Sequence, residues 1–295
     1  MIELRVASTP ADLEVWAEVK SRVVPNEPVT AEQLAATDEP GRLLLLAERD
    51  GAVAGCGIAA LSNFGGRVFL AARVLPEHRR RGVGRELVRA LAEHGRALGR
   101  EGVNAFVYAG DDAALSFVRS YGMCEVDYQL EQVRVIGDEP PASAPDGIEI
   151  ISLAGRREAL LEAVWPVAQE GYADMPLPGA VSLPFAMWMR DEATRPEGSF
   201  AALDDGEPVG YAGLMDHANG SAVAEHGLTV VRRDRRGRGI ARALKRAQLH
   251  WASTSGVVEL ITWTQKGNEA MQALNASLGY ENRSRVLTMQ GPLPG

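Results

Sequence analysis

Hydrophobic residues recur along the chain with two different periods, and the change from one period to the other outlines its elements. Short apolar or alternating runs predict β-strands, whereas apolar residues three and four positions apart predict amphipathic helices. In the first half, the predicted strands are residues 2–7, 43–47, 53–60, 68–74 and 103–108. The predicted helices of this half are residues 10–20, 31–36, 83–98 and 113–120. In the second half, the predicted strands are residues 148–153, 200–203, 209–215, 222–231 and 257–264. The predicted helices of this half are residues 157–170, 180–194, 241–255 and 268–278. A further strand closes each half, and two prolines in residues 171–179 predict a loop there.

The two halves repeat one order of elements. An interval of 157 positions separates Arg79 from Arg236 and also Gly122 from Gly279, without a gap between these points. A repeat of domain size indicates a duplicated domain. We therefore expect an N-terminal domain at residues 1–136, a proline-containing linker at 137–147 and a C-terminal domain at 148–295.

Each half is predicted to follow the order β-α-α-β-β-β-turn-α-β-α-β. Three successive strands do not fit the regular alternation of strand and helix in a doubly wound parallel sheet. The expected fold class is α/β (α+β), with a mixed, mostly antiparallel sheet flanked by helices in each of two tandem domains.

A basic turn with glycines joins a strand to a helix in each half. The first N–H groups of a helix lack intrahelical partners and carry the positive end of its dipole, so such a turn predicts a pyrophosphate site. Two other phosphate motifs are excluded, because Leu87 replaces the last glycine of G-x-G-x-x-G and Gly-Lys-Ser/Thr is absent. The turn residues expected to bind the anion are Arg236, Gly237, Arg238, Gly239, Ile240 and Ala241, and, in the first half, Val74, Arg79, Arg80, Arg81, Gly82, Val83 and Gly84.

Composition narrows the class of protein. The 295 residues are 46% hydrophobic and 24% charged, as in ordinary globular proteins, and the net charge of −8 argues against a nucleic-acid surface. No apolar run approaches the ~20 residues that span a bilayer, and the N-terminus lacks a signal-peptide layout, so we expect a cytoplasmic protein without a membrane partner. Cys56 and Cys124 have no metal-ligand spacing, so we expect free thiols and no metal site.

These features resemble the GNAT superfamily of acyl-CoA-dependent N-acyltransferases. The family signature Arg/Gln-x-x-Gly-x-Gly/Ala is matched at residues 79–84 and 236–241, and a second block ending in Gly-Phe/Tyr is matched at residues 268–280. The tandem layout is similar to that of the mycothiol synthases and related actinobacterial double-GNAT proteins. The resemblance implies two GNAT folds and acetyl-CoA, or another acyl-CoA, as the acyl donor.

The resemblance also implies contacts to the donor. In GNAT proteins the pantetheine lies beside the fourth strand, where a backbone N–H polarises the thioester carbonyl. In the second block, Met271 is expected to contact the donor, and Asn268 is either a helix N-cap, like Asp111 in the first half, or a further contact. The strand residues expected to pair with the pantetheine are Leu228, Thr229, Val230 and Val231.

Acyl transfer to an amine needs a base that removes a proton from the amine. A glutamate base on the fourth strand of mycothiol synthase-like relatives implies this role for Glu225. A period of two predicts that Glu225 shares a face of its strand with Val231, and that His226 points to the other face. The first half has Val68 and Phe69 in place of Glu225 and His226, so we expect only the C-terminal domain to be catalytic.

The general acid does not follow the family pattern. GNAT enzymes often place a tyrosine four residues before the glycine of the second block, where this chain has Asn275, or Val118 in the first half. Departure of the thiolate is then helped either by solvent or by Asn275. This difference also argues against carrying over the substrate of the mycothiol synthases.

The acceptor is expected to contact the segment that forms the acceptor wall in GNAT proteins. Here this segment contains Tyr172 and Asp174, and Asp174 either holds an acceptor ammonium or is a solvated loop residue. The expected function is transfer of an acetyl group from acetyl-CoA to a primary amine of a small molecule or peptide, by a monomer or homodimer. The alternative is a non-catalytic acyl-CoA-binding or sensing protein, which the missing tyrosines favour and Glu225 disfavours.

Overall fold

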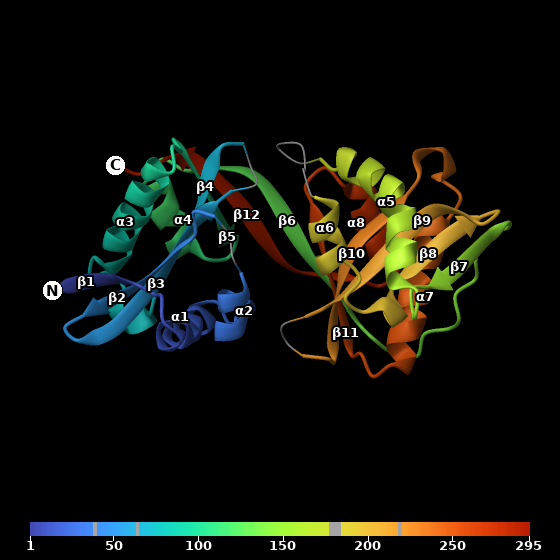
Figure 1. Cartoon of the computed structure of the whole chain (residues 1–295), viewed down its shortest axis with the longest axis horizontal. Helices are drawn as coiled ribbons and strands as arrows, with labels where there is room; N and C mark the ends of the chain where they lie inside the picture. The colour runs from blue at the N-terminus through green and yellow to red at the C-terminus, as the bar shows by residue number, and fades with distance from the viewer. Residues whose placement is uncertain (38–39, 63–64, 177–183, 218–219) are drawn as a thin grey trace. The chain divides into compact units, whose positions relative to one another are not determined.

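A computed structural model describes residues 1–37, 40–62, 65–176, 184–217 and 220–295 and divides the chain into two compact units (Figure 1). Unit 1 consists of Met1–Tyr128 and Val286–Gly295, and unit 2 consists of Gln129–Arg285. None of the helices in these described ranges is long and apolar enough to cross a membrane.

Unit 1 is built on a sheet with strand order β1-β2-β3-β4-β5-β12, in which, among the described residues, only the pair β4–β5 is parallel. Its strands are β1 (Ile2–Val6), β2 (Leu43–Arg49), β3 (Ala52–Leu61), β4 (Arg67–Val74), β5 (Gly102–Tyr108) and the end of β12 (Glu281–Pro292). Its helices are α1 (Pro10–Val23), α2 (Ala31–Ala36), α3 (Val83–Ala97) and α4 (Asp112–Arg119).

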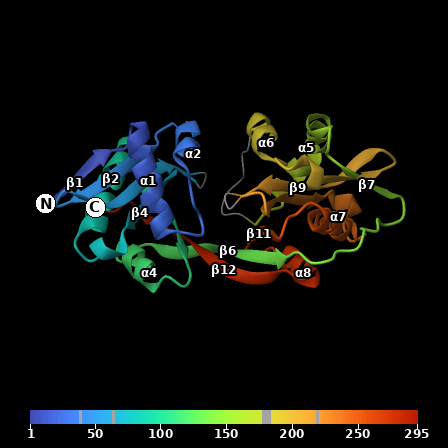
Figure 2. The same ribbon diagram turned by 90° about the horizontal axis from the view of Figure 1, so that it is seen from below.

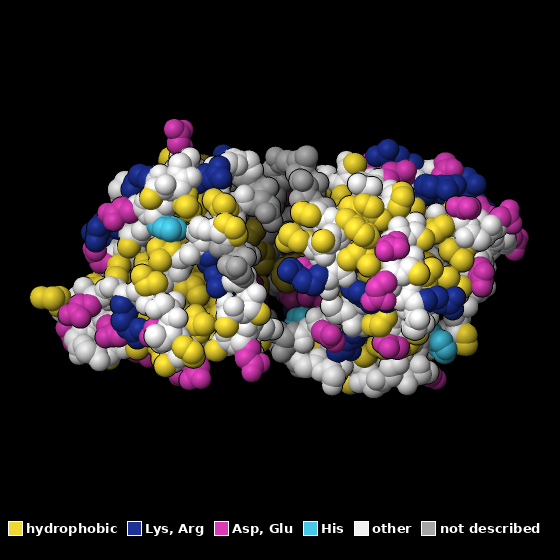
Figure 3. All heavy atoms as spheres, viewed as in Figure 1, with side chains coloured by type: hydrophobic (Ala, Val, Ile, Leu, Met, Phe, Trp, Pro, Cys, Tyr) yellow, Lys and Arg dark blue, Asp and Glu magenta, His cyan; other side chains and the backbone are white. Residues whose placement is uncertain are grey.

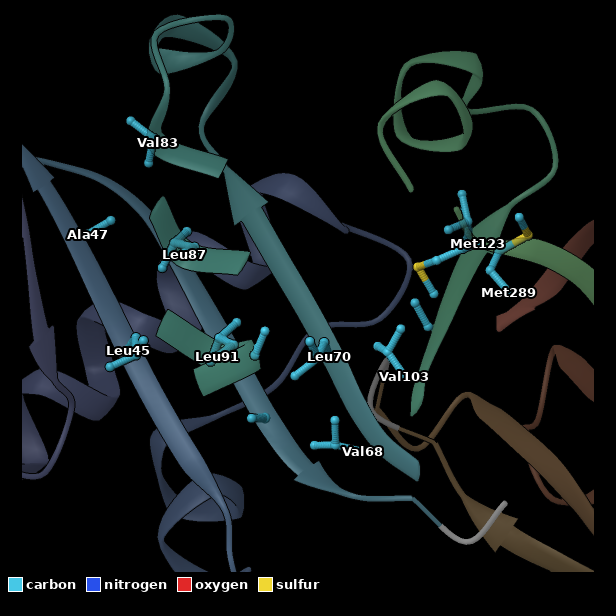
Figure 4. Packing of buried hydrophobic residues seen from close by; sticks show 14 of the residues in the cluster. Leu45, Ala47, Val68, Leu70, Val83, Leu87, Leu91, Val103, Met123 and Met289 are labelled. Atoms are coloured by element: carbon cyan, nitrogen blue, oxygen red, sulfur yellow. The ribbon is translucent and has the colours of Figure 1, made fainter. Parts of the chain in front are cut away.

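Helix α3 covers one face of the sheet in unit 1. Leu87 and Leu91, one helical turn apart, are both 0% exposed and pack with Leu70 of β4 (Figure 4). On the opposite face, α1 places the buried Trp16 so that its indole N–H donates to the carbonyl of Gly57 at 3.1 Å. The apolar stripes of the predicted helices are therefore the sides that pack against the sheet.

Unit 2 has the corresponding strand order β6-β11-β10-β9-β8-β7, and only the pair β10–β11 is parallel in the part of unit 2 that the structure describes. Its strands are the end of β6 (Cys124–Val135), β7 (Ile148–Ser152), β8 (Phe200–Asp204), β9 (Glu207–Asp216), β10 (Val223–Val231) and β11 (Glu259–Gln265). Its helices are α5 (Arg157–Ala173), α6 (Phe185–Asp191), α7 (Ile240–Thr254) and α8 (Glu269–Ser277).

Helices cover both faces of the sheet in unit 2. Figure 2 shows α5 and α6 on one side of β9 and α7 on the other. Apolar side chains gather over α5 and α6 in Figure 3. Phe185 and Met187 of α6 are exposed. The predicted loop at 171–179 and helix at 180–194 lie partly in residues 177–183, which are outside the described residues. The loop prediction is wrong at its start, because α5 continues to Ala173.

The two compact units do not coincide with the two repeats of the sequence. Residues 129–135 of β6 end the first repeat but pair with β11 in unit 2. Residues 286–292 of β12 end the second repeat but pair with β5 in unit 1. The expected boundaries at 136 and 148 therefore mark the sequence repeats, whereas the compact units exchange their last strands.

The parallel strands separate soon after they meet in each unit. The β10–β11 pairing covers Val223–Glu225, and the β4–β5 pairing covers Arg67–Phe69. Beyond Glu225, β10 continues to Val231 beside β9 alone among the described strands. This separation leaves one edge of β10 open to pair with an extended ligand.

A β-bulge in β10 changes which side chains share a face. His226 pairs with Leu214 of β9 and Thr229 with Ala212, so β10 advances by one residue more than its partner. Glu225 consequently lies on the face of Val230, which packs against α5, and not on that of Val231. The prediction that Glu225 and Val231 share a face is wrong, because it assumed an unbroken period of two.

The bulge also changes the comparison between the repeats. Asn104 and Ile261 are 157 positions apart and pair with Phe69 and Glu225, respectively. The β3–β4 register is regular, so β4 has no counterpart of the extra residue. Phe69, and not Val68, is therefore the structural equivalent of Glu225, and the first repeat still carries an apolar side chain there.

Candidate functional site

The glycine turn of unit 2 has a backbone that suits an anion. After β10, a 3₁₀ turn at Arg233–Arg235 leads to Gly237 and Gly239, whose φ angles of 77° and 80° lie in the left-handed region. Gly239 is the N-cap of α7, and the first α-helical bond runs from the Ala243 N–H to its carbonyl at 3.0 Å. The N–H groups of the preceding helical residues are thus the orphan donors of a helix N-terminus.

A cavity of about 450 Å³ opens between this turn, β10, α5 and α8. The predicted donor-binding residues of unit 2 line it, except Arg238, which pairs with Asp204 at 3.2 Å. The lining is apolar along β10 and α8 and basic at the turn, as expected for a ligand with an apolar arm and phosphate groups at its end. The lining residues are Gly171, Asp174, Met175, Pro176, Leu228, Thr229, Val230, Val231, Arg235, Arg236, Gly237, Gly239, Ile240, Ala241, Arg242, Gly267, Asn268, Ala270, Met271 and Leu274.

Glu225 lies on β10 before the bulge and does not line the cavity. Its side chain is 27% exposed, and burial, together with the charge of Glu131, raises the pKa of its carboxyl group to about 7. The Nε2 atom of His217 lies 3.9 Å from its carboxylate, but burial lowers the pKa of that imidazole. Glu225 can therefore exchange a proton near neutral pH without a fixed ion pair.

Asp174 lines the cavity, but its carboxylate is already paired. It accepts from Arg233 Nη2 and from Arg236 Nη2, both at 2.5 Å, and these guanidinium groups lower its pKa to about 2. With both arginines bound to it, the carboxylate of Asp174 is not placed to hold an acceptor ammonium. Asp174 instead orients two arginines of the turn, because the longer helix α5 carries it there.

Tyr172 and Asn275 also lie away from the cavity. Tyr172 packs in the core beneath α5, where burial raises the pKa of its phenol. Asn275 is 0% exposed, and its Nδ2 donates to Gln132 Oε1 at 2.9 Å, so its amide belongs to a buried network. The adjacent Leu274 faces the cavity instead, and the structure gives no support to Asn275 as an aid to thiolate departure.

Asn268 fits both of its interpretations. Its Oδ1 accepts from the Met271 N–H at 3.4 Å, which makes it the N-cap of α8, and both residues line the cavity. Asp111 caps α4 in the same way, through the Ala114 N–H at 2.9 Å.

Comparison with known proteins identifies the family. A sequence model described as the acetyltransferase (GNAT) family matches residues 10–123 and 159–280. The chain belongs to this family. The resemblance noted in the sequence is thus confirmed, as are the mixed α/β fold and the assignment as a GNAT-type N-acetyltransferase.

Relatives share the tandem layout. A mycothiol acetyltransferase of Thermomonospora curvata is 29% identical over 90% of this chain and 88% of its own length, and one of Nocardia farcinica is 28% identical over 86% and 84%. Among solved structures, a GCN5-related N-acetyltransferase from Sphaerobacter thermophilus has a TM-score of 0.79 at 20% identity, covering 100% of this chain and 96% of that one. A tandem GNAT protein from the clavulanic acid biosynthesis pathway has a TM-score of 0.78 at 21% identity, covering 100% and 99%.

The GNAT turn of unit 1 keeps its backbone but not the open space behind it. Arg79 Nε donates to Val74 O at 3.1 Å, as Arg236 Nε does to Val231 O at 2.9 Å. A Cβ atom on Gly84 would meet the ring of Phe117 at 3.3 Å. In unit 2 the corresponding positions are Ala241 and Leu274, which both line the cavity. An aromatic ring therefore occupies in unit 1 the space that is open in unit 2.

The other predicted residues of the first repeat lie in this turn and at the start of α3. Arg80 adopts a φ of 61° where unit 2 has Gly237, and Gly82 is the N-cap of α3 with a φ of 87°. Val83 is buried under the sheet, whereas Arg81 is exposed. The first repeat thus keeps the backbone conformation of the turn in unit 2, and anion binding there stays a prediction.

One buried carboxyl group near this GNAT site was not predicted. Glu192 is 6% exposed, and its Oε1 accepts from Tyr211 OH at 3.0 Å and from the Leu228 N–H at 3.3 Å. Its sequence neighbours Arg190 and Asp191 are charged, so the sequence predicts a solvent-exposed run and not a buried position for Glu192. The available signal was Gly227, because a glycine inside a strand often marks a bulge.

Proposed function

We propose that unit 2 transfers an acetyl group from acetyl-CoA to a primary amine, with Glu225 as the general base. The observation that carries this proposal is a carboxyl group with a pKa of about 7, on the strand that also lines the cavity. An ordinary glutamate is too weak a base to deprotonate an ammonium efficiently, and a raised pKa brings its basicity close to neutral pH.

The cavity residues supply the proposed donor site. Acetyl-CoA brings an acyl group already activated as a thioester. The open edge of β10 from Leu228 to Val231 would pair with the pantetheine, apart from the Leu228 N–H, which donates to Glu192. Met271 and Leu274 would pack against the pantetheine. The backbone after Gly239, with Arg236 beside it, would bind the pyrophosphate.

The position of Glu225 determines the proposed path of the proton that leaves the acceptor. The carboxylate takes a proton from the acceptor ammonium, directly or through a water molecule, and leaves the amine free to attack. Since Asn275 points away from the cavity, protonation of the departing thiolate is left to solvent.

For the acceptor, we propose a small-molecule amine of the mycothiol type as the first compound to test. Proteins named mycothiol acetyltransferases resemble this chain across both repeats. A peptide N-terminus is the second acceptor to test.

Release of free thiol from acetyl-CoA, measured with a mycothiol-type amine and a panel of other amines, tests the function. Glu225→Gln should lower kcat by roughly 10²–10⁴-fold with little change in the affinity for acetyl-CoA. The exposed Glu207→Gln on the neighbouring strand is the control and should behave like the wild type. Tight acetyl-CoA binding without turnover for any amine would instead favour an acyl-CoA-binding or sensing protein.

A further inference from the structure

The carboxyl group of Glu192 occupies the bulge of β10. Its Oε1 accepts the Leu228 N–H at 3.3 Å, at the point where the β9–β10 register shifts, and also accepts from Tyr211 OH at 3.0 Å. A bulge leaves an extra residue outside the ladder, and a buried backbone N–H there needs another acceptor. Glu192 supplies that acceptor.

Two glycines leave room for this carboxyl group. A Cβ atom on Gly227 would lie 2.1 Å from Glu192 Oε1, and one on Gly213 would lie 1.8 Å from the same atom. Real Cβ atoms do not approach so closely. The Gly227 position is the simpler of the two, because its three nearest atoms all belong to the Glu192 carboxyl group.

The backbone that carries Glu192 is itself held firmly. Ala193 has a φ of 52°, a left-handed conformation that an alanine adopts only where its surroundings impose it. Arg157 of α5 imposes it by donating to the carbonyls of Ala193, Met189 and Glu192, the first two at 3.0 and 2.5 Å. The chain thus fixes the position of one buried carboxyl group through a strained residue and a multiply bonded arginine.

We propose that Glu192 is a positioning residue for acyl transfer: it holds the β10 bulge and thereby fixes the face on which Glu225 lies. The bulge places Glu225 with Val230 toward α5. Without the extra residue, a period of two would turn Glu225 to the face covered by α7. This inference rests on the proposed role of Glu225.

Unit 1 provides an internal comparison. Its β3–β4 register is regular, and Phe69 lies at the position of Glu225. The repeat that lacks the bulge also lacks the base. The two features therefore occur together in unit 2, as expected if the bulge serves Glu225.

Two substitutions of Glu192 separate positioning from simple stabilisation. Glu192→Gln keeps an oxygen that accepts from Leu228 and Tyr211, so kcat should remain close to the wild-type value. Glu192→Leu keeps the bulk but removes the acceptor, and kcat should fall about 10²-fold, as for a small displacement of a catalytic group. The exposed Glu197→Leu is the matched control and should leave kcat unchanged.

Hydrogen exchange of the Leu228 amide gives a readout that does not depend on turnover. It should be about tenfold faster or more in Glu192→Leu than in the wild type or Glu192→Gln, because a hydrogen bond to a carboxyl group is lost. Equal exchange in all variants would overturn the proposal. A wild-type protein with no turnover would remove the proposed function, while this exchange would still decide whether Glu192 holds the bulge.

Gly227→Ala completes the test through a double-mutant cycle. In the wild type, the added methyl group collides with Glu192, so both Leu228 protection and kcat should fall. In a Glu192→Ala background the same methyl group has space, and it should cause little further loss. Losses that simply multiply would mean that Gly227 is not reserved for the carboxyl group, and the proposal would be wrong.

Discussion

The carboxyl group of Glu225 owes its raised pKa to burial and to Glu131, and a mutation can remove the second cause. Glu131 is 6% exposed and accepts from Arg283 Nη2 and Ser284 Oγ, both at 2.6 Å. Because a raised pKa leaves Glu225 protonated at low pH, a rate that needs its carboxylate rises with pH through about 7 and then levels off.

Glu131→Gln should move this rise to lower pH. The substitution removes a negative charge that raises the pKa of Glu225, while the rate above the rise should change little. Glu259→Gln is the matched control, because Glu259 also pairs with Arg283, at 2.7 Å, but is not a cause of the shift at Glu225. Profiles of kcat/KM against pH for the three proteins test this, and an unmoved rise in Glu131→Gln would argue against Glu225 as the base.

Individual residues were predictable where a motif carried them and not where a neighbour far along the chain decided their role. The role proposed for Glu225 comes from its family position and stays a prediction. For Asp174, the sequence left open an acceptor contact or a solvated loop residue, because it does not reveal that Arg233 and Arg236 reach this carboxylate across 59 and 62 positions. The buried position of Glu192 likewise depends on Arg157 and on glycines of two other strands.

At the scale of elements, the two glycine turns are matched in backbone but differ in the space behind them. Gly82 and Gly239 are both N-caps with φ angles near 80°, so aspartate is strained to a similar extent at either site. Gly239 borders the 450 Å³ cavity, whereas Phe117 fills the corresponding space near Gly84 in unit 1.

Gly239→Asp should abolish acetyl-CoA binding and turnover, because a carboxylate would face the pyrophosphate at the helix N-terminus. Gly82→Asp introduces a similar backbone strain and should leave kcat nearly unchanged, which makes it the control for folding. Calorimetric titration and thiol-release assays on both variants test this. Equal loss of turnover in the two variants would contradict the assignment of catalysis to unit 2.

Most strands and helices could be predicted from periodicity, because burying one face imposes that pattern locally. Helix α2 matches its predicted bounds, and α3 ends one residue early. The bulge in β10 escaped prediction because its one sign in the sequence is a single glycine, Gly227, while the extra residue reverses the alternation of side chains. That single residue accounts for the wrong face given to Glu225 and for the wrong equivalent, Val68, in the first repeat.

At the scale of the whole molecule, the exchange of β6 and β12 is the feature that the sequence does not reveal. A terminal strand shows the same apolar pattern whether it completes its own sheet or that of the other repeat. Only the partners distinguish the two arrangements, as when Gln132 of β6 receives the Nδ2 donor of Asn275 in unit 2. The sequence repeat predicts two domains, and the structure has two compact units that are made of other segments than the two repeats.

The exchange predicts which fragment of the chain is stable. Residues 148–295 follow the sequence repeat, but they leave β11 without β6, Asn275 without Gln132 and Arg283 without Glu131. Residues 129–285 keep all three contacts. Arg283 keeps its pair with Glu259, but the buried side chains of Asn275 and Thr264 both lose Gln132 as their acceptor. Each buried polar group left unpaired costs about 1–3 kcal/mol, and 1 kcal/mol shifts Tm by about 2–4 °C at this size, so the first fragment should melt about 10 °C lower. It should also aggregate more readily through the open edge of β11. Thermal unfolding of both fragments beside the full chain provides the measurement. Equal stability would mean that residues 286–292 fold back to replace β6, and that the exchange of strands is not needed to complete unit 2.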